Sequence, residues 1–214
     1  MKKRYKNIVW DWNGTLLNDF TTGLKTLNDM LDRRGVSIVN EKTYKDIFGF
    51  PVIDFYHKVG FDMEKESFHN LSLDFVETYD RYITDIFLNP QVLEILPAIQ
   101  QQGMKQYILS ALKEDILHQM LSDFKIEDYF EQACGSDDIY ASSKTERGQR
   151  MLSLYKFSPE DTLMIGDTLH DAEVAEALGF DCLLFAGGHN SEWRLREKAS
   201  VIQDFGELNQ LLGL

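Results

Sequence analysis

Short apolar segments alternate with helical patterns along most of the chain, and this alternation limits the possible folds more than any other feature. The expected strands are residues 8–10, 106–109, 132–134, 162–165, 182–185 and 200–202. Between them, apolar side chains recur at helical spacing, as in Ile116, Met120 and Phe124. Strands that alternate with helices form a parallel sheet covered on both faces. The sequence therefore predicts an α/β fold with a doubly wound parallel sheet.

One stretch, from about residue 18 to residue 86, interrupts this alternation. It holds several helical patterns with no strand between them, and two of these patterns stop at Gly35 and Gly60. We expect a helical subdomain over 18–86, inserted after the first strand. The sheet domain would then consist of 1–17 and 87–214.

The composition is that of a globular protein and excludes some classes of partner. The chain has 22 Lys and Arg against 35 Asp and Glu, a net charge of −13. Nucleic acids and anionic membranes are bound by clustered cations, so neither is an expected partner. No apolar run has the length of a signal peptide or membrane span, and Cys134 and Cys182 fit no disulfide framework or metal spacing. These features predict a cytoplasmic protein with reduced cysteines, and we expect a monomer or homodimer.

The first segment with chemical content is 8–17, where an apolar strand ends in Asp11. Asn13 follows two residues later and can return to the same side of an extended chain. Asn13 and Gly14 also form the dipeptide most typical of a two-residue hairpin turn. The returning strand could only be 15–17, because helical spacing begins after it. The local pattern leaves both interpretations open.

The second segment is 161–171, in which another apolar strand is followed by Asp167 and, four residues later, by Asp171. Thr168 and Asp171 match the capping box at the start of a helix, which requires no active site. Capping and support of a metal ion are compatible roles for Asp171.

Two single residues complete the candidate set. Ser110 follows the strand 106–109 and precedes a helix, so its ordinary role would be an N-cap. Ser143 and Glu146 match a capping box, which would make Lys144 the first helical residue. A cation there opposes the helix dipole by about 0.3 to 1 kcal/mol unless an anion is bound beside it.

The expected topology brings these places together. In a doubly wound sheet, ligands bind at the carboxyl ends of the strands, where Asp11, Ser110 and Asp167 are expected. Oxygen ligands without His or Cys suit a hard cation, Mg²⁺ above all. Lysine and helix N-terminal amides suit phosphate. The sequence predicts a site for Mg²⁺ and phosphate.

In order and spacing, these segments resemble the four motifs of the haloacid dehalogenase-like (HAD) superfamily. The segment 11–16 resembles the first motif, Ser110 the second, Lys144 the third and 166–171 the fourth. The resemblance covers essentially the whole chain and is greatest to the branch of phosphoglycolate phosphatase and β-phosphoglucomutase. It implies a Rossmann-like core with an inserted helical cap, and it disfavours a hairpin at Asn13 and Gly14.

The resemblance also implies roles for the residues in the motifs. Asp11 would attack phosphorus and form an aspartyl-phosphate that water then hydrolyses. The implied ligands of Mg²⁺ are Asp11, the Asn13 backbone carbonyl, Asp167 and, directly or through water, Asp171. The residues implied to bind phosphate are Asn13, Gly14, Ser110, Ala111 and Lys144. The implied catalytic set is Asp11, Asn13 and Lys144.

Asn13 departs from the family pattern, because most phosphatases of this family have a second Asp at that place. That Asp protonates the leaving group and later activates water, and an amide can do neither. The expected function is a Mg²⁺-dependent phosphatase for a small phosphorylated metabolite. It would be slow, restricted to good leaving groups, or reliant on another group. The alternatives are a low-turnover or non-hydrolytic phosphate-binding regulatory protein and a sugar phosphomutase.

Substrate choice would lie in the cap, which closes over the phosphate. Candidate specificity positions are the loop 48–51, Lys45 and His57, each of which also fits a structural or solvated role. His189 is expected to be an ordinary loop residue, although it could face the site. Trp12 either shields the nucleophile or packs in the core.

Overall fold

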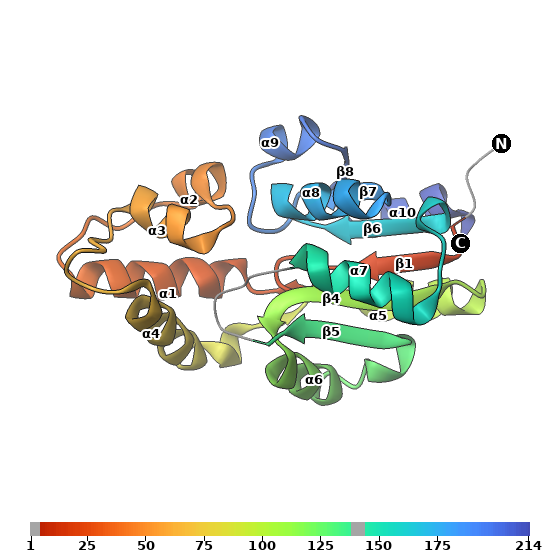
Figure 1. The fold of residues 1–214 in the computed structure, drawn as a ribbon, viewed down its shortest axis with the longest axis horizontal. Helices are drawn as coiled ribbons and strands as arrows, with labels where there is room; N and C mark the ends of the chain where they lie inside the picture. The colour runs from red at the N-terminus through yellow and green to blue at the C-terminus, as the bar shows by residue number, and fades with distance from the viewer. Residues whose placement is uncertain (1–4, 138–143) are drawn as a thin grey trace.

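A six-stranded parallel sheet forms the centre of the computed structural model, which describes residues 5–137 and 144–214 (Figure 1). The strand order is β5-β4-β1-β6-β7-β8. The strands are β1 (Asn7–Trp10), β4 (Lys105–Lys113), β5 (Gln132–Ser136), β6 (Thr162–Gly166), β7 (Asp181–Phe185) and β8 (Ser200–Ile202). All neighbouring pairs are parallel. The predicted doubly wound α/β sheet is confirmed, with every expected strand in place.

Helices cover both faces of this sheet. One face is covered by α5 (Val92–Gln101), α6 (Glu114–Asp123) and the short α10 (Gly206–Leu208). The other face is covered by α7 (Lys144–Tyr155) and α8 (Leu169–Leu178), and α9 (Glu192–Arg196) packs beside β8. Short turns of 3₁₀ helix lie at η1 (Ile83–Asp85), η2 (Glu127–Tyr129) and η3 (Pro159–Asp161), and η4 (Asn209–Gly213) is a π-helical turn.

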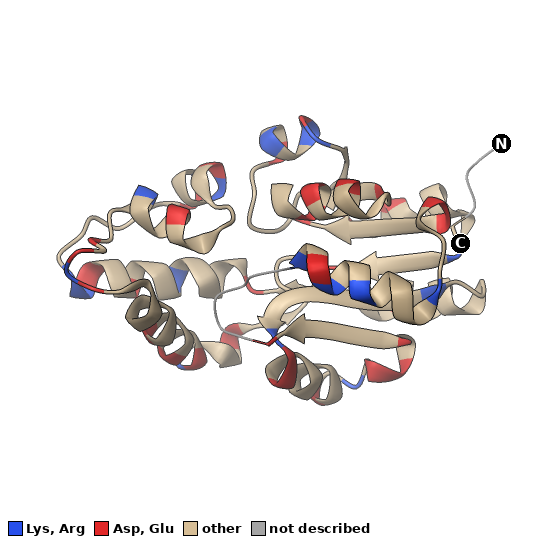
Figure 2. Cartoon of the chain, viewed as in Figure 1, with Lys and Arg blue, Asp and Glu red and all other residues tan. Residues whose placement is uncertain are grey.

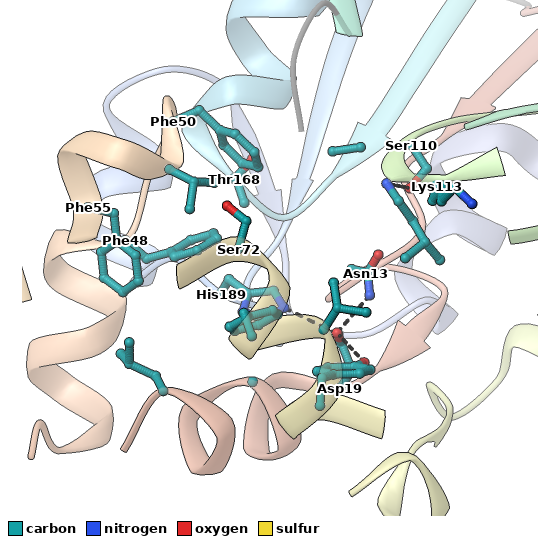
Figure 3. Close-up of a pocket in the computed structure, with 18 of the residues that line it drawn as sticks. Asn13, Asp19, Phe48, Phe50, Phe55, Ser72, Ser110, Lys113, Thr168 and His189 are labelled. Atoms are coloured by element: carbon teal, nitrogen blue, oxygen red, sulfur yellow. Dashed lines mark hydrogen bonds and ion pairs between the residues drawn. The ribbon is translucent and has the colours of Figure 1, made fainter. Parts of the chain in front are cut away.

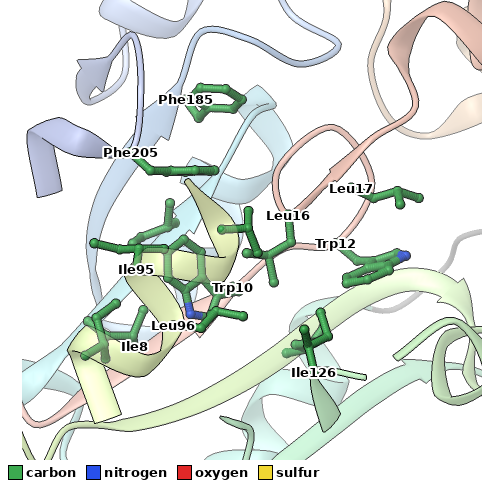
Figure 4. Packing of buried hydrophobic residues seen from close by; sticks show 14 of the residues in the cluster. Ile8, Trp10, Trp12, Leu16, Leu17, Ile95, Leu96, Ile126, Phe185 and Phe205 are labelled. Atoms are coloured by element: carbon green, nitrogen blue, oxygen red, sulfur yellow. The ribbon is translucent and has the colours of Figure 1, made fainter. Parts of the chain in front are cut away.

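Burial on both faces explains why the strands are continuously apolar rather than alternating. In β1, Ile8 and Trp10 belong to the cluster beneath α5 and α6, whereas Val9 packs with α7 and α8 on the opposite face. Figure 4 shows Trp10 among Ile95, Leu96 and Phe205, and its ring meets that of Phe205 edge-on at 5.7 Å.

A helical lobe of four helices lies at one end of the sheet (Figure 1). Its helices are α1 (Phe20–Arg33), α2 (Glu41–Ile47), α3 (Val52–Val59) and α4 (Phe68–Asp80). They share a hydrophobic cluster of their own, separate from the two clusters of the sheet. The sequence patterns predict α1, α3 and α4 but miss α2, because Tyr44 is the one fully buried residue of that helix.

The lobe joins the sheet through a short antiparallel ribbon of β2 (Leu17–Asn18) and β3 (Phe87–Leu88). The hairpin interpretation of Asn13 and Gly14 is therefore wrong: β1 pairs with β4 and β6, and β2 pairs with a strand 70 positions along the chain. The β1–β2 loop is left free to line the carboxyl end of the sheet.

Charged side chains lie mainly on the helices, and Figure 2 shows the acidic residues spread over them rather than gathered in one patch. Within the described part of the chain, no helix has both the length and the apolar character required to cross a membrane. Cys134 and Cys182 are free, as predicted.

Candidate active site

The strand order reverses around β1, which lies between β4 and β6. From β1 the chain builds outward through β4 and β5, and then returns to build β6, β7 and β8 on the other side. Loops from the two halves diverge there and leave a crevice at the carboxyl ends of the strands. Asp11 follows β1 and Asp167 follows β6 at this place.

Three carboxylates meet in the crevice. Oxygens of Asp11, Asp167 and Asp171 all lie within 4.8 Å of one another, and all three residues are buried. Lys144 Nζ donates to Asp11 Oδ1 and to Asp171 Oδ1, each at 2.5 Å. Burial raises the pKa of Asp11 well above its usual value and that of Asp167 to about 6. The group of three, called here the carboxylate cluster, is therefore short of positive charge.

Asp171 has two roles at once. Its Oδ2 accepts from the backbone N–H of Thr168 at 3.0 Å, and Thr168 Oγ1 in turn caps the N–H of Asp171. The predicted capping box is therefore confirmed, while Oδ1 remains for Lys144. Burial works to raise the pKa of Asp171, but Lys144 and the Thr168 donors hold it below its usual value.

Asp167 is held by donors from two loops. Thr15 Oγ1 donates to Oδ1 at 3.0 Å, and the backbone N–H of His189 donates to Oδ2 at 2.6 Å. Both loops approach closely through glycine: Gly14 has φ +75°, and any side chain at Gly14 or Gly188 would collide with the Asp167 carboxylate. The Asn-Gly sequence after β1 thus serves this approach and not a hairpin.

Ser110 lies inside β4, not at its end where it was expected, and Lys113 is the N-cap of α6, so the alternative role of Ser110 as an ordinary N-cap is wrong. The register between β4 and β5 shifts after Leu109, and the strand continues to Lys113 before α6 begins. Ser110 Oγ accepts from the N–H of Leu112 at 3.0 Å, which leaves its own hydroxyl proton for another acceptor. Ser110 and Ala111 line one cavity together with Asp11 and Lys144.

Lys144 begins α7, as its pattern predicts. Ser143, the other member of the capping box expected there, lies outside the described residues. Lys144 is buried, and the two carboxylates beside it raise its pKa against the opposing effect of burial. The ammonium ion at this helix start therefore lies between two carboxylates, which offset its unfavourable interaction with the helix dipole.

Another buried carboxylate, Asp19, lies outside the carboxylate cluster and was not predicted. It accepts from Asn13 Nδ2 at 2.8 Å, the Gly14 N–H at 2.8 Å, Tyr79 OH at 2.9 Å and His189 Nε2 at 3.2 Å. Burial alone would raise the pKa of Asp19, but the charge of His189 and the hydrogen bonds lower it. The amide of Asn13 is therefore held by a carboxylate that accepts hydrogen bonds from three other groups as well.

His189 is not the ordinary loop residue that the sequence suggested. It is buried, and Asp19 raises its pKa to about 9 although burial opposes this. Its Nδ1 lies 3.0 Å from Tyr44 OH in α2, so the ring joins the sheet domain to the helical lobe. The sequence did contain an indication of this position. His189 follows β7, and β7 lies beside β6, which Asp167 follows directly. Asp19 had no such signal.

The crevice opens into a cavity of about 230 Å³ that extends from Asp11 into the helical lobe. Figure 3 shows Phe48, Phe50 and Phe55 on one side of it and Ser110 and Lys113 on the opposite side. The loop 48–51 therefore contributes to the cavity through two of its residues.

Three other candidates lie elsewhere. Lys45 forms an ion pair with Glu41, and His57 is exposed. Neither lines this cavity. Trp12 packs against Phe124 in the sheet core, which supports its packing role.

Comparison with known proteins identifies the class of protein that this fold and site define. Residues 8–185 match the family model described as haloacid dehalogenase-like hydrolase, and the chain belongs to this family. It is thus an enzyme of the HAD-like hydrolases, as its motifs predict.

The individual relatives share only a quarter of their residues or fewer with this chain. The chain is 25% identical to a phosphoglycolate phosphatase of Nitrosococcus oceani, over 99% of this chain and 98% of that protein. It is also 25% identical to a 5'-nucleotidase of Pseudomonas aeruginosa, over 98% and 96%. A haloacid dehalogenase-like hydrolase from Streptococcus pneumoniae has the same fold, with a TM-score of 0.84 at 20% identity, over 96% of this chain and 97% of that one. The first of these relatives is named a phosphatase and the second a nucleotidase, so the two names indicate different substrates.

Proposed function

We propose that this protein is a Mg²⁺-dependent phosphatase that hydrolyses a small phosphorylated metabolite through an aspartyl-phosphate on Asp11. The observation that carries the proposal is the carboxylate cluster, in which three buried carboxylates lie together and the ammonium ion of Lys144 contacts two of them, Asp11 and Asp171. Such a deficit of positive charge is costly unless a cation is bound. The family and the phosphatases among its relatives support the same reaction.

Asp11 would be the nucleophile. Lys144 holds its Oδ1, whereas among the described residues Oδ2 has only a long contact of 3.5 Å with Thr15 Oγ1. An Oδ atom would attack phosphorus while the ester O–P bond breaks and the leaving oxygen takes the electron pair. Water would then hydrolyse the acyl-phosphate, releasing phosphate and restoring Asp11.

The donor set fits Mg²⁺. Side-chain oxygens of Asp11, Asp167 and Asp171 lie close together with no His or Cys among the cluster, and the Asn13 carbonyl would complete the oxygen ligands. When bound, the ion would reduce the repulsion between an anionic nucleophile and an anionic phosphoryl group. The remaining work belongs to the side chains around it.

Ser110, Ala111 and Lys144 would hold the phosphoryl oxygens, through a hydroxyl proton, a backbone N–H and an ammonium ion. The amides of Asn13 and Gly14 were expected to join them. The Gly14 N–H already donates to Asp19, so a phosphate role for it would require that hydrogen bond to break.

We further propose that residues 18–86 form a cap over a core made from 1–17 and 87–214. The lobe has its own hydrophobic cluster. The chain passes between the sheet and the lobe twice, and both passages run through the β2–β3 ribbon. The shared cavity would place the leaving group of the substrate against the lobe.

The test is phosphate release from p-nitrophenyl phosphate with and without Mg²⁺. We expect activity with Mg²⁺, its loss on chelation, and a fall of about a thousandfold or more in kcat for Asp11→Asn. Unchanged turnover in Asp11→Asn would overturn the assignment of the nucleophile. Thermal unfolding of the variant serves as the folding control.

A second function, phosphate binding without efficient turnover, is favoured by one observation: the Asn13 amide donates a hydrogen bond to Asp19, and an amide does not act as a general acid or base. It predicts an Asp11 adduct that forms but persists. Mass spectrometry after incubation with acetyl phosphate separates the two functions, because a phosphatase would return to the free enzyme.

A further inference from the structure

The end of the cavity that lies in the helical lobe is walled by aromatic side chains. They include Phe48, Phe50, Phe55, Phe68, Phe75 and Tyr79. Phe48 and Phe50 meet at 5.8 Å, and Phe75 stacks on Tyr79 at 5.9 Å. Ring faces and edges of this kind bind other rings through apolar contact and quadrupole attraction.

The cations along the same cavity are all paired. Among the described residues that line it, Lys113 lies 2.6 Å from Asp115, Lys144 serves the carboxylate cluster and His189 serves Asp19. Asp80 adds a further acid to the lining. A leaving group with a carboxylate, as in phosphoglycolate, would be desolvated without an unpaired cation to meet it, which is unfavourable.

Asn13 limits the leaving group in a second, independent way. An alkyl alcohol leaves as a strongly basic alkoxide and needs a proton from the enzyme, which an amide does not supply. A phenol has a pKa of about 10, as in tyrosine, so its oxygen can leave as the anion with the electron pair of the broken O–P bond. The chemistry at Asn13 and the aromatic wall therefore favour the same kind of alcohol.

We propose that the substrate is a phosphate monoester of an uncharged aromatic alcohol whose ring lies among Phe48, Phe50 and Phe75. This inference rests on the proposed function for the position of the phosphate at Asp11. It makes a separate claim about the leaving group, which binding measurements can test without turnover.

The experiment compares two phosphonates that cannot be hydrolysed, in the presence of Mg²⁺. The ring-bearing probe is 1-naphthylmethylphosphonate, and the carboxylate-bearing probe is 3-phosphonopropanoate. Isothermal titration of the wild-type protein should give a Kd about tenfold lower or better for the naphthyl compound. Equal or tighter binding of 3-phosphonopropanoate would overturn the inference.

Two variants on α4 locate the effect. Phe75 lines the cavity, whereas Leu73 on the same helix is 43% exposed and does not line it. Phe75→Ala should weaken naphthylmethylphosphonate binding about fivefold or more while leaving methylphosphonate binding unchanged. Leu73→Ala, the matched control, should change neither. An equal loss for both ligands in Phe75→Ala would show a damaged fold and would remove the support for the ring site.

Measurements of turnover distinguish a failure of this inference from a failure of the proposed phosphatase function. If acetyl phosphate and p-nitrophenyl phosphate both resist hydrolysis while the naphthyl preference persists, the hydrolase function fails and the ring site stands. If acetyl phosphate is hydrolysed but the naphthyl preference is absent, the phosphatase stands and the inference about its substrate fails.

Discussion

The carboxylate cluster and Asp19 are buried acids beside the same cavity, and the protein balances their negative charge to different extents. The carboxylate cluster has three carboxylates and one ammonium ion, and burial raises the pKa of both Asp11 and Asp167. Asp19 has four donors to itself, including the charged ring of His189, and its pKa is lowered. The difference separates a buried acid whose charge the protein itself balances from buried acids whose charge a bound cation would balance.

The contrast follows from simple electrostatics. A buried carboxylate loses its hydration, and this loss must be offset by donors or by opposite charge. The protein itself supplies the full offset at Asp19. At the carboxylate cluster one Lys cannot neutralise three acids. The neighbouring carboxylates therefore add to burial in raising the pKa of Asp11 and Asp167. A divalent cation would remove that imbalance.

Removal of the one ammonium ion should have the largest effect. Lys144→Met leaves the carboxylate cluster with no cation, and we expect the free energy of unfolding to fall by about 3 to 5 kcal/mol without Mg²⁺. Urea denaturation measures the change. Mg²⁺ should restore part of the loss in the variant, because the ion would bind the same carboxylates.

The matched control is Lys113→Met, which removes an exposed ion pair with Asp115. This substitution should cost about 0 to 1 kcal/mol, and the cost should be the same with and without Mg²⁺. If Lys144→Met costs no more than Lys113→Met, the carboxylate cluster does not depend on its cation and the comparison fails.

Replacement of Asp by Asn should change the free energy of unfolding differently at Asp19 and in the carboxylate cluster. Asp19→Asn leaves His189 and Tyr79 without a charged acceptor, so we expect a loss of about 2 kcal/mol whether or not Mg²⁺ is present. Asp167→Asn removes a like charge from the carboxylate cluster, so without Mg²⁺ it should be neutral or stabilising by about 1 kcal/mol.

Thermal unfolding with added Mg²⁺ completes this test. The wild-type protein and Asp19→Asn should both gain stability, by about 2.7 kcal/mol when Mg²⁺ is at a hundred times its Kd. Asp167→Asn should gain much less. A similar loss of stability in both variants would mean that Asp167 is as fully compensated as Asp19.

The sequence predicts the sheet well and the site in part, for related reasons. Strands buried on both faces have unbroken apolar runs that are easily recognised in the sequence. In α2 only Tyr44 is buried, so the helix lacks the repeated apolar positions that would predict it. Asp11, Asp167 and Lys144 lie at the ends of regular elements, so topology alone predicts that they meet.

Asp19 and His189 could not be predicted in this way. They are 170 positions apart, and their contact exists only when the helical lobe and the loop after β7 are both in place. Ser110 was expected at the carboxyl end of its strand, whereas β4 continues to Lys113. The register shift that lengthens β4 depends on its pairing with β5, which no local pattern encodes.

The pH dependence of stability tests whether the charge of His189 contributes to the balance at Asp19. His189 has a pKa of about 9 in the folded protein, above its ordinary value of about 6.5, because Asp19 outweighs burial. A raised pKa stabilises the fold fully below the unfolded value, and this contribution is lost as pH rises through the folded value. The free energy of unfolding should therefore decline between about pH 6.5 and 9.

His189→Gln isolates this effect, because glutamine can still donate one hydrogen bond to Asp19 but does not titrate. Urea denaturation from pH 6 to 10 should show a smaller decline in the variant than in the wild-type protein, with the two curves converging at alkaline pH. Parallel curves would mean that His189 is neutral in the fold. Asp19 would then depend on neutral donors alone, and the contrast with the carboxylate cluster would be one of hydrogen bonds and not of charge.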